Sequence, residues 1–114
     1  MGRGSVRLTA QALLVLGAML REPDGEWYGL QLSKRSGLKP GTIYPILSRL
    51  LEAEWVERRW EEIDPVAEGR PRRRLYRLSA VGAPAARWAV DEHLASLRGE
   101  TPKGRRLRPG LRLT

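Results

Sequence analysis

Four arginines, Arg70, Arg72, Arg73 and Arg74, lie within five consecutive positions of the chain. A guanidinium group keeps its charge at physiological pH, and its planar set of donors matches the oxygens of a phosphate group. No acidic residue interrupts the cluster, so the four cations repel one another unless an anion is present. A charge run is usually a solvated surface, but this one favours contact with a phosphate backbone.

A second candidate site lies in the segment 41–51, "GTIYPILSRLL". Its isoleucines and leucines recur at three- and four-residue steps, which predicts a helix with one buried stripe. The opposite face carries an arginine that suits guanine edges or phosphate, and hydroxyl groups that can donate to phosphate. An ordinary solvated helix face is the alternative interpretation. The outward residues are Thr42, Tyr44, Pro45, Ser48 and Arg49.

Pro45 allows two starting points for this helix. If Thr42 is the cap, the proline lies in the first turn, where its missing N–H has no helical partner. If the helix begins at Pro40, the ring of Pro45 faces the carbonyl of Gly41 and the axis should bend. Either start leaves Thr42 and Tyr44 at the amino-terminal end of the helix.

Other kinds of chemistry find little support in the sequence. There is no cysteine and only one histidine, His93, so no nucleophile–base set and no metal cluster is expected. The acidic residues of segment 61–68 could attract a divalent cation, but we expect them to temper repulsion among the arginines. We therefore predict that the protein is not an enzyme, and that it has no cofactor and no metal site.

Composition points to a polyanionic partner. The 114 residues suffice for one domain and carry a formal net charge of +8, which favours nucleic acid first and an anionic membrane surface second. The longest apolar stretch, "ALLVLGAML", is too short to span a bilayer, and "REP" follows where a signal peptide would have a cleavage site. We expect a cytoplasmic protein without a membrane segment.

The hydrophobic pattern predicts three helices, a β-hairpin and a last helix. The first helix runs from a cap at Thr9 to about Leu20, the second runs from about Tyr28 to a stop at Gly37, and the third ends near Glu54. The second helix is expected to bury Leu30, with Leu32 as a further candidate. Two strands, within segments 55–63 and 72–79, flank the loop 64–71.

The last predicted helix follows Ser79, which is expected to cap it, and runs from Ala80 to about Arg98. Pro84 falls in its first turns, so its start should be kinked or displaced.

This order of elements is that of a winged helix-turn-helix, a mainly α fold with a β-hairpin, in which the later helix of the pair reads DNA. We predict a flexible arm over residues 1–7 and a winged-helix domain over 8–79. A C-terminal dimerisation helix follows over 80–98, and a disordered basic tail over 99–114.

Two stretches resemble the PadR family of bacterial transcriptional regulators. The first is "GLKPGTIYPILSRLLEAEWVE", in which Pro40, Gly41, Thr42, Tyr44 and Pro45 match the family's hallmark. The second is "GRPRRRLYRLSAVG", which matches the end of the family's hairpin. "WYGLQL" keeps a family glycine at Gly29 but reverses the usual glycine–tyrosine order, and Trp55 stands where the family usually has a glycine.

The resemblance implies a homodimer that binds double-stranded operator DNA, usually as a repressor, and that a ligand or stress signal releases. A two-fold dimer predicts an inverted-repeat operator. We predict effector binding at Trp88, where a small aromatic ligand could stack, although a helix tryptophan is more often a core residue. The predicted DNA contacts are Lys34, Lys39, Thr42, Tyr44, Pro45, Ser48, Arg49, Arg70, Arg72 and Arg73. The predicted dimer interface comprises Val90, Leu94 and Leu97 with Leu13 and Leu16.

Two other functions would also explain the charge. One is a basic protein that binds nucleic acid without selecting sequence, which does not need the tyrosine–proline helix start. The other is a winged-helix module that binds another protein and does not retard DNA.

Overall fold

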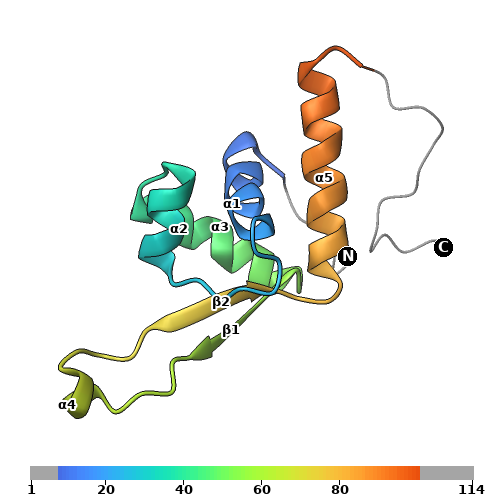
Figure 1. Ribbon diagram of the computed structural model, residues 1–114. Helices are drawn as coiled ribbons and strands as arrows, with labels where there is room; N and C mark the ends of the chain where they lie inside the picture. The colour runs from blue at the N-terminus through green and yellow to red at the C-terminus, as the bar shows by residue number, and fades with distance from the viewer. Residues whose placement is uncertain (1–7, 101–114) are drawn as a thin grey trace.

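The computed structural model describes residues 8–100 of the chain (Figure 1). The predictions for the arm over residues 1–7, and for the tail from residue 101, lie outside the described residues. The elements in chain order are α1 (Ala10–Leu20), α2 (Gly29–Ser36), α3 (Pro40–Glu52), β1 (Val56–Trp60), α4 (Pro65–Glu68), β2 (Arg74–Leu78) and α5 (Gly82–Leu97).

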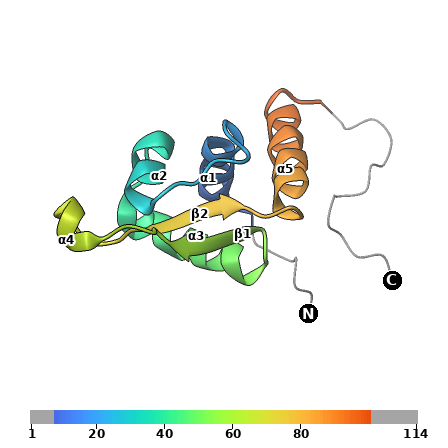
Figure 2. The ribbon, with the colours of Figure 1, turned by 60° about the horizontal axis from the view of Figure 1, so that its bottom comes forward.

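The predicted fold class is confirmed. Helices α1, α2 and α3 pack together over a two-stranded antiparallel sheet, and α5 lies beside α1 (Figures 1 and 2). The distal part of the hairpin, with α4 at its tip, extends past the helices (Figure 1). Among residues 8–100, none of the helices combines the length and the apolar character needed to cross a membrane.

Helix α1 is the centre of the core. Thr9 caps it as predicted, since its Oγ accepts a hydrogen bond from the Ala12 N–H at 3.1 Å. Neighbouring helices cover α1 on more than one side, which explains its broad apolar surface. Leu16 is fully buried within this core. Its predicted place in a dimer interface is therefore corrected, because no part of the side chain is open to a partner.

Helix α2 ends at Gly37 as predicted, with a left-handed φ of 78° that glycine adopts without strain. Leu32 is buried, but Leu30 is 53% exposed, so the expectation that Leu30 is buried was wrong. The reason is geometric: two residues along an α-helix are about 200° apart, so Leu30 and Leu32 cannot share one buried face.

Helix α3 begins at Pro40 with Lys39 as its N-cap, so the earlier of the two predicted starts is the one observed. Thr42 is not the cap. A proline at the first helical position needs no N–H partner, which favours this start. Pro45 lies inside the helix, where it has no N–H to donate to the Gly41 carbonyl.

The left-handed residue between α3 and the hairpin is Glu54, with a φ of 66°. The family resemblance predicts the usual glycine position at Trp55, one residue later. Trp55 is instead 2% exposed and forms part of the core, so the turn keeps its shape through Glu54 and gains a large buried side chain.

The two strands of the hairpin are shorter than predicted, and the loop between them contains a helical turn. Its ladder runs from the pair Val56↔Leu78 to the pair Trp60↔Arg74. One more backbone hydrogen bond follows the ladder, from the Glu61 N–H to the Arg73 carbonyl at 2.8 Å. Beyond it the two arms separate, and the expected loop contains the single turn α4, capped by the Asp64 carboxylate. Trp27 also exchanges two backbone hydrogen bonds with Tyr76, of 2.8 and 2.7 Å, so the segment before α2 lies along β2.

Helix α5 begins at Gly82 rather than Ala80, which confirms the displaced start expected from Pro84. The Ser79 Oγ accepts the Gly82 N–H at 2.8 Å and donates to the Glu54 carbonyl at 2.7 Å. A Cβ at Gly82 would collide with the backbone carbonyl of Trp55. The first turn of α5 thus rests directly on the turn that leaves α3.

Candidate nucleic-acid interface

Helix α3 presents a polar face because its aliphatic residues are committed to the core. Ile43, Ile46, Leu47 and Leu50 are buried, with at most 3% of their surface exposed. The opposite side chains are accessible: Tyr44, Pro45 and Ser48 are exposed, and Thr42 and Arg49 are half-buried. The structure therefore brings together, on one face, all five residues predicted for this helix.

Tyr44 is held in place by α2. Its ring and hydroxyl lie so close to the Cα of Gly29 that a Cβ at Gly29 would collide with them. Tyr44 nevertheless remains 44% exposed. The glycine at the start of α2 thus has a steric function that the sequence did not reveal: it makes room for the tyrosine of the outward face.

Lysine side chains flank the amino-terminal end of α3. Lys34 lies in the last turn of α2, Lys39 is the N-cap of α3, and both are exposed. Within residues 8–100, neither lysine forms an ion pair, and Arg49 forms none either. Three cations near one helix face are therefore available to an external anion.

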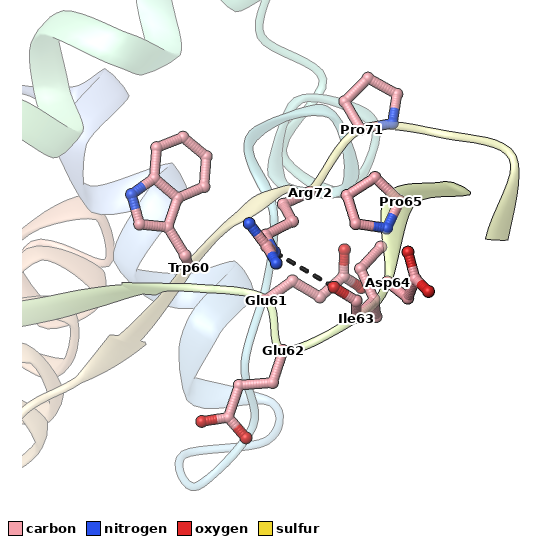
Figure 3. Close-up of a pocket in the computed structure, with 8 residues that line it drawn as sticks. All are labelled: Trp60, Glu61, Glu62, Ile63, Asp64, Pro65, Pro71 and Arg72. Carbon is pink, nitrogen blue, oxygen red and sulfur yellow. Dashed lines mark hydrogen bonds between the residues drawn. The ribbon is translucent and has the colours of Figure 1, made fainter. Parts of the chain in front are cut away.

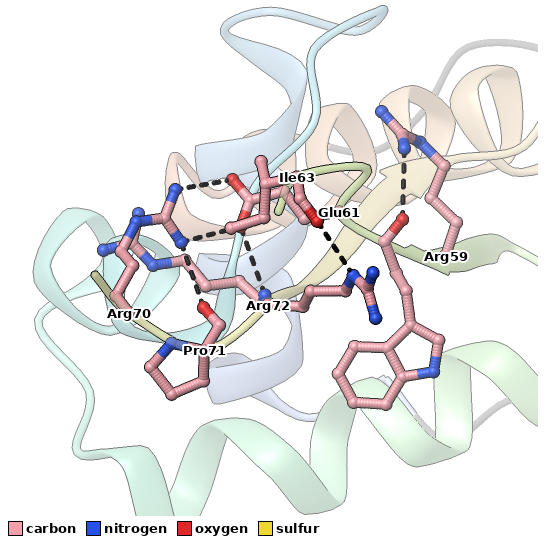
Figure 4. A network of polar contacts seen from close by, with 8 residues as sticks. Arg59, Glu61, Ile63, Arg70, Pro71 and Arg72 are labelled. Atoms are coloured by element: carbon pink, nitrogen blue, oxygen red, sulfur yellow. Dashed lines mark hydrogen bonds and ion pairs between the residues drawn. The ribbon is translucent and has the colours of Figure 1, made fainter. Parts of the chain in front are cut away.

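Arg70 is neutralised inside the hairpin tip. Its Nη1 and Nη2 donate to the two carboxylate oxygens of Glu61 at 2.8 and 3.0 Å, and Nη1 also contacts the Pro71 carbonyl (Figure 4). The expectation that acidic residues temper the arginine cluster is confirmed at Glu61. The view of Arg70 as an arginine without a counterion is corrected, because the hairpin brings Glu61 beside it.

Glu61 is the organising group of the tip. The Arg70 guanidinium and, secondarily, the backbone N–H of Arg73 stabilise its charged form, which lowers the pKa of Glu61 to about 2. A carboxylate that accepts several hydrogen bonds in this way ties both arms of the hairpin together. In the sequence, only the presence of acids near the cluster pointed to this role.

The other two predicted tip arginines have different partners. Arg72 is exposed and its Nε donates to the Ile63 carbonyl at 3.1 Å, across the hollow between the arms (Figure 3). The Arg73 guanidinium lies 4.2 Å from the ring centroid of Tyr28, a cation–π contact. Neither forms an ion pair among the described residues, so both keep donors for a phosphate group. The sequence had also not indicated Tyr28 as a partner of Arg73.

The predicted dimer residues differ in exposure. Leu94 and Leu97 are 45% and 69% exposed, near the carboxyl-terminal end of α5, while Val90 and Leu13 are half-buried against the core. Trp88 is half-buried on α5. The structure thus leaves an apolar strip open on the last turns of α5.

Within residues 8–100, no group of histidine, aspartate or glutamate side chains is arranged to hold a metal ion.

A model of the PadR-like family of transcriptional regulators matches residues 15–87, from the middle of α1 to the start of α5. The chain belongs to the PadR-like family. This family is one of transcriptional regulators.

Solved structures agree with this fold. A PadR family regulator from Clostridium difficile R20291 is similar, with a TM-score of 0.58 and 19% identity over 80% of this chain and 90% of that one. ZitR from Lactococcus lactis, a C30AH42A mutant, gives a TM-score of 0.62 and 17% identity over 84% of this chain. The structure of overoxidised AbfR bound to DNA gives a TM-score of 0.60 and 23% identity over 79% of this chain.

The PadR-like chain spans about 60% of the length of both ZitR and AbfR. Among curated proteins, none matches its sequence at a significant level.

Proposed function

We propose that this PadR-like protein is a repressor that acts as a homodimer on an inverted-repeat operator and is released by a ligand or stress signal. The observation that carries the proposal is the outward face of α3. Its polar and proline side chains stay accessible, while the aliphatic side chains of the same helix are buried in the core. A protein of this kind acts in the cytoplasm, where bacterial DNA lies.

In the proposed complex the amino-terminal half of α3 enters the major groove. Arg49 contacts a guanine edge or a phosphate group, Tyr44 donates to phosphate, and Ser48 serves either role. Thr42 and Pro45 meet the groove at the leading end of the helix, and Lys34 and Lys39 neutralise phosphates beside it. The wing contributes Arg72 and Arg73, since Arg70 is already paired with Glu61.

Homodimer formation is proposed through α5, where Leu94 and Leu97 leave apolar surface open beside Val90 and Leu13. A two-fold axis near this helix would place two α3 helices about 34 Å apart, one turn of DNA. We expect Leu94→Asp to give monomers on a sizing column and to weaken operator binding strongly. A Leu94→Asp protein that stays dimeric would contradict the assignment.

Effector release is proposed at Trp88, because a half-buried tryptophan on the proposed dimer helix offers an aromatic surface for a flat ligand. Two structural neighbours are consistent with a role in gene regulation: AbfR, in a structure bound to DNA, and an adhesin competence repressor from Streptococcus pyogenes.

The test is a selection of duplexes from a random pool with the purified full-length protein, followed by competition at about 0.15 M salt. We expect an inverted repeat to emerge and to be bound at least ~10³-fold more tightly than random DNA. Equal binding of all duplexes would support the non-specific alternative and overturn operator recognition. No DNA binding at any salt concentration would favour the protein-interaction module.

A further inference from the structure

The two faces of the hairpin differ in what their charged side chains contact. Successive residues of a strand point to opposite faces, and residues directly opposite in a ladder share one face. Val56, Tyr76 and Leu78 are buried against the helices, so their face is the inner face of the hairpin. The register places Arg58 opposite Tyr76, and Trp60 opposite Arg74, on this same inner face.

The outer face carries ion pairs. Glu57 and Arg77, directly opposite each other in the ladder, are paired at 3.1 Å. Arg59 donates through Nε and Nη2 to the two carboxylate oxygens of Glu26, each at 2.7 Å, and this lowers the pKa of Glu26. The charges of these two arginines are therefore matched within the protein.

The inner face has cations without such partners. Its positions within β1 and β2 contain Arg58 and Arg74 and no acid. Within residues 8–100, neither arginine forms an ion pair. Figure 3 shows the Glu62 side chain pointing away from Trp60, on the other side of the chain, so this acid does not supply a counterion near Trp60.

Trp60 orders one of the two cations. The Arg74 guanidinium lies 4.1 Å from the centroid of the Trp60 ring, and the Arg74 Nε is buried without a hydrogen-bond partner among the described residues. A stacked guanidinium loses less rotamer freedom on binding and keeps in-plane donors for an oxygen ligand. Trp60 keeps 54% of its surface exposed while it makes this contact.

We propose that Arg58 and Arg74, with Trp60 as the support of Arg74, form a phosphate-binding strip on the inner face of the hairpin. This inference rests on the proposed function. Helix α3 packs against β1, so a DNA strand leaving α3 for the wing tip would pass along the inner face. The strip adds two backbone contacts between those of α3 and those of Arg72, and it assigns the paired outer arginines no direct part in DNA binding.

The test compares substitutions that change the charge equally on the two faces. Binding of the selected operator is measured by fluorescence anisotropy at several salt concentrations for Arg58→Ala and Arg74→Ala, with Arg77→Ala as the matched outer-face control. We expect each inner variant to weaken binding about 10-fold and to reduce the salt slope by about 0.9. The control should keep the wild-type slope.

Equal effects of all three substitutions would overturn the strip, while selective operator binding by the wild-type protein would still uphold the proposed function. Wild-type protein that fails to select an operator would instead overturn the proposed function itself. Because Arg58 is exposed, Arg58→Gln provides a variant whose fold is retained, and its thermal unfolding curve should match that of the wild type.

The role of Trp60 is tested by a double-mutant cycle. Trp60→Ala and Arg74→Ala should each lower affinity, and the double variant should lose little more than Arg74→Ala alone, because Trp60 acts through Arg74. Trp60→Phe keeps an aromatic face and should restore most of the affinity and the salt slope. Fully additive losses would show that Trp60 does not act through Arg74.

Discussion

Helix α3 and the hairpin are held by different forces, although both are proposed to face the same DNA. Burial of Ile43, Ile46, Leu47 and Leu50 fixes α3, whereas the hairpin beyond Trp60 depends on Glu61, Arg70 and a few hydrogen bonds between its arms. Buried aliphatic side chains carry no charge to titrate or to screen, while ion pairs respond to both pH and salt. The reading helix should therefore be the rigid part, and the wing the part that solution conditions adjust.

Aliphatic truncation gives the largest expected difference between the two regions. Leu50→Ala removes a fully buried side chain and should lower the free energy of unfolding by about 3 kcal/mol. Val66→Ala in α4 truncates a side chain that is 90% exposed and should stay within about 0.5 kcal/mol of the wild type. Denaturant unfolding measures both, and equal losses would mean that the tip belongs to the core.

Arginine substitutions should separate the roles of the two regions in recognition. Arg49→Ala on α3 is expected to cost about 1–3 kcal/mol of operator binding and to relax preference at one base pair. Arg72→Ala on the wing should weaken all sequences alike and lower the salt slope by about 1. Binding assays on single-base operator variants decide the matter. An Arg49→Ala protein with unchanged affinity and preference would show that this face of α3 does not read bases.

The joint between the two regions is strained at Glu54. A left-handed residue other than glycine destabilises the folded state by about 1–2 kcal/mol. Glycine removes this strain, but it also raises the conformational entropy of the unfolded chain, which offsets part of the gain. We expect Glu54→Gly to raise the free energy of unfolding by about 0.5 kcal/mol. Glu54→Ala keeps the strain and is the control, so a glycine variant no more stable than the alanine variant would contradict the explanation.

A pH response is expected at the wing tip through Glu61. Since the pKa of Glu61 is lowered from 4.5 to about 2, its stabilising contacts are fully present above about pH 4.5 and are lost as the pH falls through about 2. The amide resonance of Arg73, which donates to Glu61, should report this titration by NMR. Glu61→Gln should abolish the change at Arg73, and α3 amides should not follow it.

Local signals in the sequence were sufficient for much of the fold. The Thr9 cap, the stop at Gly37, the three-helix order and the hairpin all depend on residues close together in the chain. The spacing of apolar residues could not predict the burial of Leu16 or the exposure of Leu30. It shows that a helix has an apolar face, but not which residues of that face other elements cover. Leu16 is in the core and Leu30 is largely exposed.

The site was predictable where it lies on a single helix. The outward residues of α3 follow from the spacing of its aliphatic side chains. The hairpin was harder, because the contact between Glu61 and Arg70 depends on where the arms separate, and the contact between Arg73 and Tyr28 joins segments 45 residues apart. The two-residue period of a strand puts Arg58 and Trp60 on the same face as Val56, so the inner strip has a signal in the sequence.

Gly82 lies where α5, the proposed dimer helix, meets the winged-helix domain. Because a methyl group there would strike the Trp55 carbonyl, α5 leaves the domain at an inclination set by direct backbone contact. In the proposed dimer, that inclination determines how far apart the two copies of α3 are carried. A side chain at residue 82 would tilt α5, and the spacing of the two α3 helices would then no longer match the helical repeat of the DNA. No residue that contacts the DNA would have changed.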